Sequence, residues 1–420
     1  MSVTKKAAAA TLAAVTLLGA AACDRPVESV SGLKPVGPNF ATALAEGEAM
    51  RRIVLTERDE TGAYLLNRVC DVFIGEPVVD PVDGAPQRYD HQVVVELPAD
   101  APANPTIKLV GDAAMQASGS KLFTCDAVDR DADGNPILDA NGQEQPVIDP
   151  VTLHAAKGDA PQVTTNGVTL DLNGYSITVS PAFGDPGKEA FENIGVVLAG
   201  EDQTLTNSAN EVSKIYGFGH NVDIEAVRPK VLGKRWDGDG DPTTVDWVYN
   251  IETRGGFGIR LSDGPALIDQ VKSVNLDPVE GQGFEARRMS SGILTVTNSH
   301  FEGGTEGAFL REVSGVTFKD NYVSGRSGPG IATRQAVSTS TRPIQILGNT
   351  VVNSTVGVLW GRDSRNNAGL KIEGNKISQY TTCGVGRSSR NTTIAPLTMA
   401  GIAAVNTFDR ATAQTCTIQD

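Results

Sequence analysis

Four stretches in the second half of the chain decide the fold: TVTNSHFEG (295–303), TFKDNYVSG (317–325), QILGNTVVN (345–353) and KIEGNKISQ (371–379). Each places an asparagine between two short apolar strands, at Asn298, Asn321, Asn349 and Asn375, so the spacings are 23, 28 and 26 residues. Self-similarity at a period of roughly 20–50 residues marks a repeat architecture. Because one coil of three short strands cannot bury its own inward side chains, the coils must stack on one another. We therefore expect the four asparagines at equivalent turns of successive coils.

Other features repeat with the same period. Each unit opens with a glycine before a short β run, at 283, 307, 330, 357 and 384, and the run LDLNGYSIT (170–178) alternates apolar and polar residues. These runs resemble the right-handed parallel β-helix repeats of the pectate-lyase-like superfamily, over about residues 160–390. The resemblance implies an all-β fold. It does not fix the function, since that superfamily includes lyases, hydrolases, epimerases, tailspikes and adhesins.

The chain divides into five segments by composition. We predict a signal peptide (1–22), a Pro- and Gly-rich tether (23–37), a small α+β cap (38–160) that begins with an amphipathic helix over Asn39–Leu55, the β-helix (161–390) and a C-terminal cap (391–420). The stretch 226–250 interrupts the repeats and is interpreted as a projecting loop.

The first residues are typical of an export signal. Lys5 and Lys6 precede an apolar run, which is too short for a membrane span, and the run ends in Ala20-Ala21-Ala22-Cys23. This end resembles a bacterial lipobox, which would place a lipid on Cys23 and make that lipid the chain's only membrane contact. The alternative is ordinary cleavage after Ala22 and secretion. Either way the sequence predicts export, to the periplasm or cell surface.

The remaining four cysteines suit disulfides in an exported protein. Four cysteines allow three pairings, and their separation along the chain favours Cys70 with Cys125 and Cys383 with Cys416. The alternative is four buried thiols, since none of them has metal-ligand spacing.

Composition and motifs exclude several functions. The 420 residues carry a net charge of −14, which disfavours nucleic acid as a partner because phosphate binding needs a basic face. The four histidines do not form a zinc-binding pair. Gly217-Phe218-Gly219-His220 lacks the second glycine of the Gly-His-Gly motif of polygalacturonases, and the accompanying acidic motifs are missing, so that hydrolase activity is disfavoured.

An arginine recurs four residues after the opening glycine, at Arg287, Arg311 and Arg334, with variants at Arg362 and Arg387. Equivalent positions in stacked coils would align these arginines about 5 Å apart, and guanidinium groups bind carboxylates bidentately. Such a column would bind an acidic polysaccharide. The alternative is that each arginine pairs with a nearby acid such as Glu285, Glu312 or Asp363.

Two acidic loops and two tryptophans complete the candidate sites. Asp129, Asp131 and Asp133 copy the start of an EF-hand loop without its final glutamate, and Asp237, Asp239 and Asp241 lie in the 226–250 stretch. Oxygen-rich loops of this kind suit Ca²⁺, although Asp-Gly turns are also common in solvated loops. Trp236 and Trp247 would stack on sugar rings or pack their loop onto the coil.

These observations predict an exported β-helix protein that binds an acidic polysaccharide. If it is an enzyme, a lyase or epimerase is favoured over a polygalacturonase. The rival hypothesis is a non-catalytic envelope or surface protein that uses the β-helix as a scaffold, which the low aromatic content of 5% and the lack of a complete catalytic motif favour.

Overall fold

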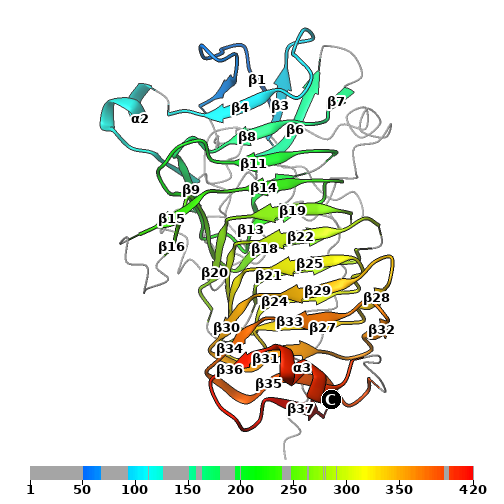
Figure 1. The fold of residues 1–420 in the computed structure, drawn as a ribbon. Helices are drawn as coiled ribbons and strands as arrows, with labels where there is room; N and C mark the ends of the chain where they lie inside the picture. Colours follow the sequence, from blue (N-terminus) through cyan, green and yellow to red (C-terminus); the bar gives the residue numbers. More distant parts are fainter. Residues whose placement is uncertain are drawn as a thin grey trace, which may run out of the picture.

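The computed structural model describes most of the chain from residue 51 onward, over 51–67, 93–111, 113–125, 151–157, 163–179, 194–198, 200–238, 247–262, 264–277, 279, 281–289, 291–391 and 397–419. Three long sheets dominate these residues, and their strands stack along one axis from the N-terminal end to the C-terminal end (Figure 1).

Sheet A forms one side of the stack. Its strands, in spatial order, are β1 Arg51–Val54, β3 Val93–Leu97, β6 Val151–Lys157, β10 Ile194–Leu198, β13 His220–Ile224, β18 Phe257–Ser262, β21 Gln282–Arg287, β24 Glu306–Arg311, β27 Ile331–Arg334, β31 Ser354–Trp360, β35 Tyr380–Ser388 and β37 Thr415–Ile418. All are parallel to their neighbours. A short strand, β7 Val163–Thr165, pairs antiparallel with β6.

Sheets B and C form the other two sides. Sheet B contains β2 Tyr64–Leu66, β4 Thr106–Leu109, β8 Thr169–Asp171, β11 Thr204–Thr206, β14 Lys230–Leu232, β19 Ala266–Asp269, β22 Leu294–Thr297, β25 Val316–Lys319, β29 Ile344–Leu347 and β33 Lys371–Glu373. Sheet C contains β5 Leu122–Cys125, β9 Ser176–Val179, β12 Ser213–Tyr216, β17 Ile251–Gly255, β20 Lys272–Asn275, β23 His300–Gly303, β26 Tyr322–Gly325, β30 Thr350–Val352, β34 Lys376–Ile377 and β36 Thr407–Phe408.

The chain visits the sheets in the order A, B, C and then returns to A one step further along the axis. The strands β21, β22, β23 and β24 show this order, which defines a parallel β-helix and confirms the all-β prediction. Two small pairs leave the coils: β15 Arg235–Asp237 with β16 Trp247–Tyr249, antiparallel, and β28 Val337–Thr339 with β32 Arg365–Asn367, parallel. Among the described residues the helices are α2 Ala113–Ser118 and α3 Met399–Val405, both too short to cross a membrane.

The N-terminal part differs from the predicted α+β cap over 38–160. Strands β1, β3 and β6 belong to sheet A, and β2 and β4 continue sheet B, so the coils begin well before residue 161. Arg51–Val54, the end of the predicted amphipathic helix, is strand β1; the earlier part of that prediction lies outside the described residues. The predicted loop at 226–250 is also shorter than expected, because β14 within it is a regular strand of sheet B.

The core fills the space enclosed by the three sheets. Inward side chains repeat in register, as in the buried row Val222, Ile259, Phe284 and Ala308 of sheet A. Phe284 and Phe301 pack with their ring centroids 5.2 Å apart. Each fully buried side chain of this size contributes roughly 1.5–3 kcal/mol, and only stacking of coils makes that burial available.

A ladder of asparagine side chains lines the corner between sheets B and C. The Asn321 amide donates to Asn349 Oδ1 at 3.1 Å, the Asn349 amide to Asn375 Oδ1 at 2.9 Å, and the Asn375 amide to Asn406 Oδ1 at 2.8 Å. Each of the three donors also bonds a backbone carbonyl of the neighbouring coil. The prediction of equivalent turns is therefore confirmed for Asn321, Asn349 and Asn375.

Asn298 was predicted in the same ladder, and this was wrong by one residue. The register that pairs Thr297 with Lys319 puts Ser299, not Asn298, beside Asn321, and the Ser299 backbone N–H donates to Asn321 Oδ1 at 2.9 Å. In each of these coils, the residue directly before the ladder position adopts the left-handed conformation. These residues, all with positive φ angles, are Asn298, Asp320, Gly348 and Gly374.

The opening glycines line the corner between sheets C and A. A Cβ atom at any of four of these glycines would lie only 2.3–2.4 Å from a side chain of sheet C. The close pairs are Gly307 with Val323, Gly330 with Val351, Gly357 with Ile377, and Gly384 with Phe408. The repeated glycine thus reflects close packing at this corner.

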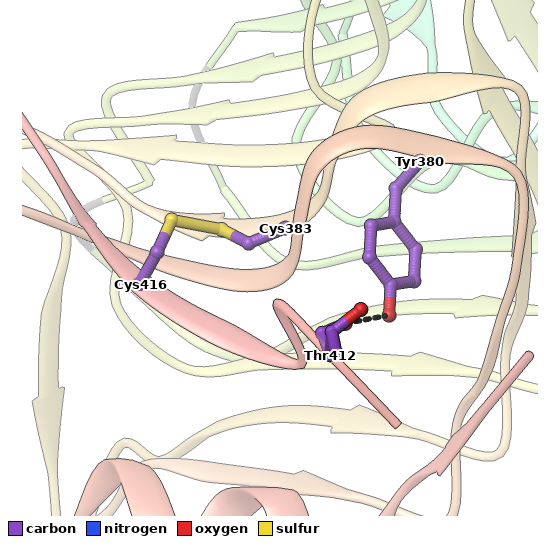
Figure 2. Close-up of a disulfide and its surroundings, with 4 residues drawn as sticks. All are labelled: Tyr380, Cys383, Thr412 and Cys416. Atoms are coloured by element: carbon purple, nitrogen blue, oxygen red, sulfur yellow. Dashed lines mark hydrogen bonds between the residues drawn. A yellow bond between two sulfur atoms is a disulfide. The ribbon is translucent and has the colours of Figure 1, made fainter. Parts of the chain in front are cut away.

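The C-terminal segment continues the coil rather than forming a separate unit. Helix α3 follows β35 where a strand of sheet B would come, and β36 and β37 extend sheets C and A. Cys383 and Cys416 form a disulfide between β35 and β37, with Cα atoms 6.0 Å apart, as the sequence suggested (Figure 2). Nearby, the Tyr380 hydroxyl donates to the Thr412 carbonyl oxygen at 3.3 Å.

Candidate functional site

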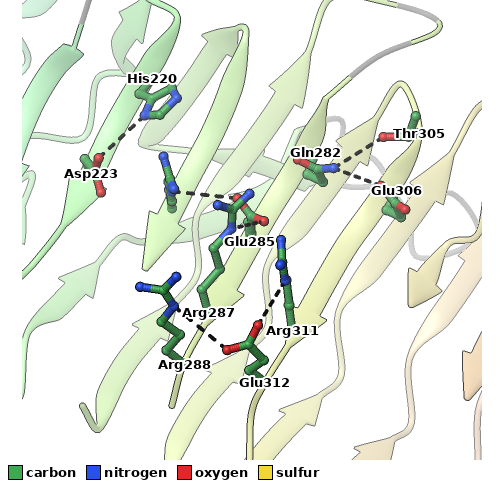
Figure 3. Close-up of polar contacts among 11 residues, drawn as sticks. His220, Asp223, Gln282, Glu285, Arg287, Arg288, Thr305, Glu306, Arg311 and Glu312 are labelled. Atoms are coloured by element: carbon green, nitrogen blue, oxygen red, sulfur yellow. Dashed lines mark hydrogen bonds and ion pairs between the residues drawn. The ribbon is translucent and has the colours of Figure 1, made fainter. Parts of the chain in front are cut away.

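The outer face of sheet A carries a row of ionisable side chains (Figure 3). The strand register sets Asp223 beside Arg260, and Arg260 beside Glu285. Each of the three lies between core residues of its own strand and so faces away from the core, yet all are at most 4% exposed. Neighbouring strands lie about 4.8 Å apart, so charges of alternating sign follow one another along the helix axis.

His220 stands at one end of this row, at the first position of β13. Its Nδ1 atom lies 3.5 Å from Oδ2 of Asp223, and its ring meets Phe257 edge-on with centroids 5.1 Å apart. The side chain is 13% exposed whereas that of Asp223 is 2% exposed. The imidazole is therefore more accessible to solvent than the carboxylate.

Two arginines hold Glu285. Arg287 Nε donates to Glu285 Oε1, and Arg260 Nε lies 3.7 Å from Glu285 Oε2. Burial lowers the pKa of the Arg260 guanidinium, while the negative charge of Asp223 raises it. Arg260 keeps its charge, because a guanidinium group is not deprotonated in proteins.

Several polar atoms of this row have no hydrogen-bond partner within the described part of the chain: His220 Nδ1, Asp223 Oδ1, Arg260 Nε and Glu285 Oε2. An unsatisfied buried polar group costs roughly 1–3 kcal/mol, and such groups are rare in folded proteins. A cluster of such atoms on ionisable side chains is a feature of many binding and catalytic sites. We name His220, Asp223, Arg260, Glu285 and Arg287 the ionic row.

The predicted arginine column continues from the ionic row. Arg287 aligns with Arg311, and Arg311 with Arg334, in successive strands of sheet A. However, Arg311 lies 3.3 Å from Glu312, and the Arg287 and Arg311 side chains are 17% and 15% exposed. The column therefore exists, but local carboxylates engage its first two members, as the alternative interpretation anticipated. Arg362 is offset by one residue, since the register sets Gly361 beside Arg334, and it pairs with Asp363 at 3.5 Å.

The tryptophans lie away from the arginine column. Trp236 and Trp247 belong to the hairpin β15–β16, whose Arg235 donates to both oxygens of Asn298 at the corner of sheets B and C. The Arg235 guanidinium also covers the Trp247 ring at 4.6 Å from its centroid. Tyr249 of the hairpin packs edge-on against His300 of sheet C, with centroids 6.1 Å apart. The hairpin and the column thus lie on different sides of the coil.

Other predicted sites lie outside the described residues: Asp129, Asp131, Asp133, Asp239, Asp241, Cys23, Cys70 and the side chain of Cys125. Asp237 is exposed at the end of β15. Within the described ranges no three His, Cys, Asp or Glu side chains group as metal ligands.

Most of the ionic row was missed from the sequence. Arg287 was predicted as part of the column, and Glu285 only as its local partner. The available signal was a charged residue inside an apolar strand, as in NVDI (221–224), GIRL (258–261) and GFEA (283–286). His220 and Asp223 also share a short spacing, but no motif linked them to Arg260.

Comparisons with known proteins bear on the fold. Residues 244–418 match a family model described as a right-handed β-helix region. Two solved structures are similar, the A-modules of the mannuronan C-5 epimerases AlgE6 and AlgE4 of Azotobacter vinelandii. They have 13% and 14% sequence identity and TM-scores of 0.37 and 0.31, each over 90% of this chain and over 93% and 91% of those chains. No curated protein matches the chain. The stacked sheets and the family match together show a right-handed parallel β-helix.

Proposed function

We propose that the protein modifies an acidic polysaccharide by moving a proton at the uronate carbon next to the carboxylate, and that the ionic row is the site. The observation that carries the proposal is the juxtaposition of an imidazole, two guanidinium groups and two buried carboxylates on one face of sheet A. Lyases and epimerases both begin by removing this proton, so both fit the same arrangement.

The chemistry needs a cation and a base. Negative charge develops on the uronate carboxylate when the adjacent C–H bond breaks, and the fixed guanidinium groups of Arg260 and Arg287 would stabilise it. Glu285 positions both arginines, because its two carboxylate oxygens face one guanidinium each. His220 is the candidate base, with Asp223 close enough to orient its ring.

The two outcomes differ only in the second step. In a lyase the electron pair of the broken C–H bond forms the C4–C5 double bond, and the C4–O glycosidic bond breaks with protonation of the leaving oxygen. In an epimerase a proton returns to C5 from the opposite face. Arg311 and Arg334 continue the line of arginines beyond the row, along the helix axis.

The test uses alginate- and pectate-type polymers with the full chain. Absorbance near 235 nm reports the unsaturated uronate of a lyase, and incorporation of deuterium at C5 in heavy water reports an epimerase. His220→Gln should lower the rate about 10²–10⁴-fold, the usual contribution of a general acid or base. Arg260→Lys should lower it as well, since a point charge cannot replace the planar guanidinium.

Arg288→Gln is the matched control. Arg288 follows Arg287 directly but is 70% exposed and lies 3.9 Å from Glu312, so its loss should leave the rate unchanged. Circular dichroism would establish that each variant folds. If neither polymer is altered, or if His220→Gln is as active as the parent protein, the proposal fails.

A second function, a non-catalytic scaffold of the cell envelope, is favoured by one observation. Glu285 and Glu312 already engage Arg287 and Arg311, which reduces the charge free for a polymer. Under this function the triple variant Arg287→Gln, Arg311→Gln and Arg334→Gln would bind polyuronates as well as the parent. The proposed enzyme predicts weaker binding that also declines with salt, because exposed charges are screened over about 10 Å at 0.1 M.

A further inference from the structure

A polar cavity of about 470 Å³ opens at the corner where sheet C turns into sheet A, in the C-terminal half of the coil. Its volume is within the range of small-molecule sites, roughly 300–1,000 Å³. Hydroxyl, amide and charged groups line it: Glu302, Tyr322, Ser324, Arg326, Asn353, Ser354, Thr355, Gln379 and Thr381.

The lining comes from four successive coils. Glu302 lies on β23, Ser324 on β26, Ser354 on β31, and Gln379 follows β34. Three steps of about 4.8 Å give the cavity a length of roughly 14 Å along the helix axis. The spacing between neighbouring strands is similar to the length of one sugar unit in an extended glycan. Polar groups on successive coils could therefore contact successive sugar units.

Glu302 is fixed by a histidine and an arginine at the cavity wall. His300 Nε2 lies 2.7 Å from Glu302 Oε1, and Arg326 Nη2 donates to Glu302 Oε2 at 3.1 Å. The other terminal nitrogen of Arg326 donates to the Asn275 carbonyl at 3.2 Å. The His300 contact holds the pKa of Glu302 down to about 2, so the carboxylate is an acceptor at any physiological pH.

An aromatic row stiffens the same wall. The His300 ring lies 4.5 Å from the Tyr322 ring and meets Tyr249 of the hairpin at 6.1 Å. Burial raises the pKa of the Tyr322 phenol, which therefore keeps its proton as a donor. An amphipathic ring beside fixed polar groups suits the mixed faces of a sugar.

Two cavity residues adopt a conformation that glycine would hold more easily. Asn353 and Gln379 have φ angles of 48° and 54°, and glutamine is uncommon in that region. The register puts them in the column of Gly303 and Gly325, where an added Cβ would meet backbone oxygens at 1.6 and 1.9 Å. The column therefore changes from glycine to amide side chains where the cavity opens.

We propose that this cavity is a second carbohydrate-binding site, which takes saccharide units through their hydroxyl groups. The two amides, the fixed carboxylate and the serine and threonine hydroxyls supply both donors and acceptors, as a polyhydroxylated ligand requires. The cavity lies at the corner of sheets C and A in later coils than the ionic row, and the two share no residue, so the proposal stands without the function proposed above.

The test is saturation-transfer NMR on the full chain with three probes: a mannuronate trisaccharide, a galacturonate trisaccharide and neutral cellotriose. Transfer to at least one probe is expected, and the comparison tells whether the site prefers acidic or neutral units. Gln379→Gly and Asn353→Gly remove the amides and suit the backbone. Each should weaken the affinity about threefold to tenfold, the loss expected for one or two hydrogen bonds.

Gln335→Gly is the matched control. Gln335 has a φ of 52°, is exposed and is not part of the cavity lining, so the same chemical change there should leave binding unaltered. Arg287→Gln tests the ionic row and should also retain transfer. If none of the probes shows transfer, if the two cavity variants bind as the parent does, or if Arg287→Gln alone abolishes binding, the proposal is wrong.

Discussion

Replacing Asn349 by alanine removes the central member of the asparagine ladder. Its Oδ1 accepts from the backbone and side-chain nitrogens of Asn321 at 3.0 and 3.1 Å, and its Nδ2 donates to the Phe318 carbonyl at 3.0 Å and to Asn375 Oδ1 at 2.9 Å. Asn349 is fully buried, so water cannot replace these four bonds. At about 1 kcal/mol per bond, with buried partners left unsatisfied, the free energy of unfolding should fall by about 3–5 kcal/mol.

The assay is unfolding in guanidinium chloride, followed by far-UV circular dichroism. The midpoints are compared with a shared m-value, the slope of the unfolding free energy against denaturant concentration. Asn298→Gly is the control. It removes an amide bonded to Asp269 at 3.0 Å and to Arg235 at 3.1 Å, but glycine suits its φ of 53°. We expect this control to lose less than about 1.5 kcal/mol. An Asn349→Ala variant no less stable than Asn298→Gly would refute the view that the ladder stabilises the coil.

Three further predictions concern pH, metal and export. The pKa of Glu302 is depressed from 4.5 to about 2, mainly by the hydrogen bond from His300, so the stabilisation is fully present above about pH 4.5 and is lost as the pH falls toward 2. Glu302→Gln should therefore lower the free energy of unfolding by about 1–2 kcal/mol at pH 7 and by progressively less in acid. An equal loss of stability at pH 7 and pH 2.5 would contradict this. We propose that the acidic loops at 129–133 and 237–241 bind Ca²⁺, so EDTA should lower the melting temperature and Ca²⁺, but not Mg²⁺, should restore it; an unchanged melting temperature would count against the metal. We also propose a lipid on Cys23, so Cys23→Ala should abolish labelling by a radioactive fatty acid, whereas an unlabelled parent protein would mean an ordinary secretory signal.

The sequence predicts what repeats at a steady interval. The opening glycines recur every 23 to 27 residues, and Arg287, Arg311 and Arg334 follow three of them at a constant offset, so counting alone aligns these arginines. The ionic row was not predictable in this way. Asp223 and Arg260 stand side by side although they are 37 residues apart, because the hairpin β15–β16 lengthens the coil between them.

The errors have similarly local causes. Asn298 looked like a ladder residue because asparagine suits both the ladder and the left-handed position before it, and only the strand register separates the two. The N-terminal coils escaped notice because the repeat signal there is weak. Strand β2, Tyr64–Leu66, has only three residues.

The ladder has a consequence for how such a chain changes length. Asn321, Asn349 and Asn375 present the same amide to the same neighbours, so each coil offers its successor an interface that fits any other coil of the series. Duplication or loss of one whole coil in the gene would rejoin matching surfaces, whereas a shift of a few residues would break the ladder and the core together. The ionic row spans the coils of β13, β18 and β21, and the polar cavity spans those from β23 to β35. Evolution can therefore lengthen or shorten the molecule beyond either site while keeping that site intact.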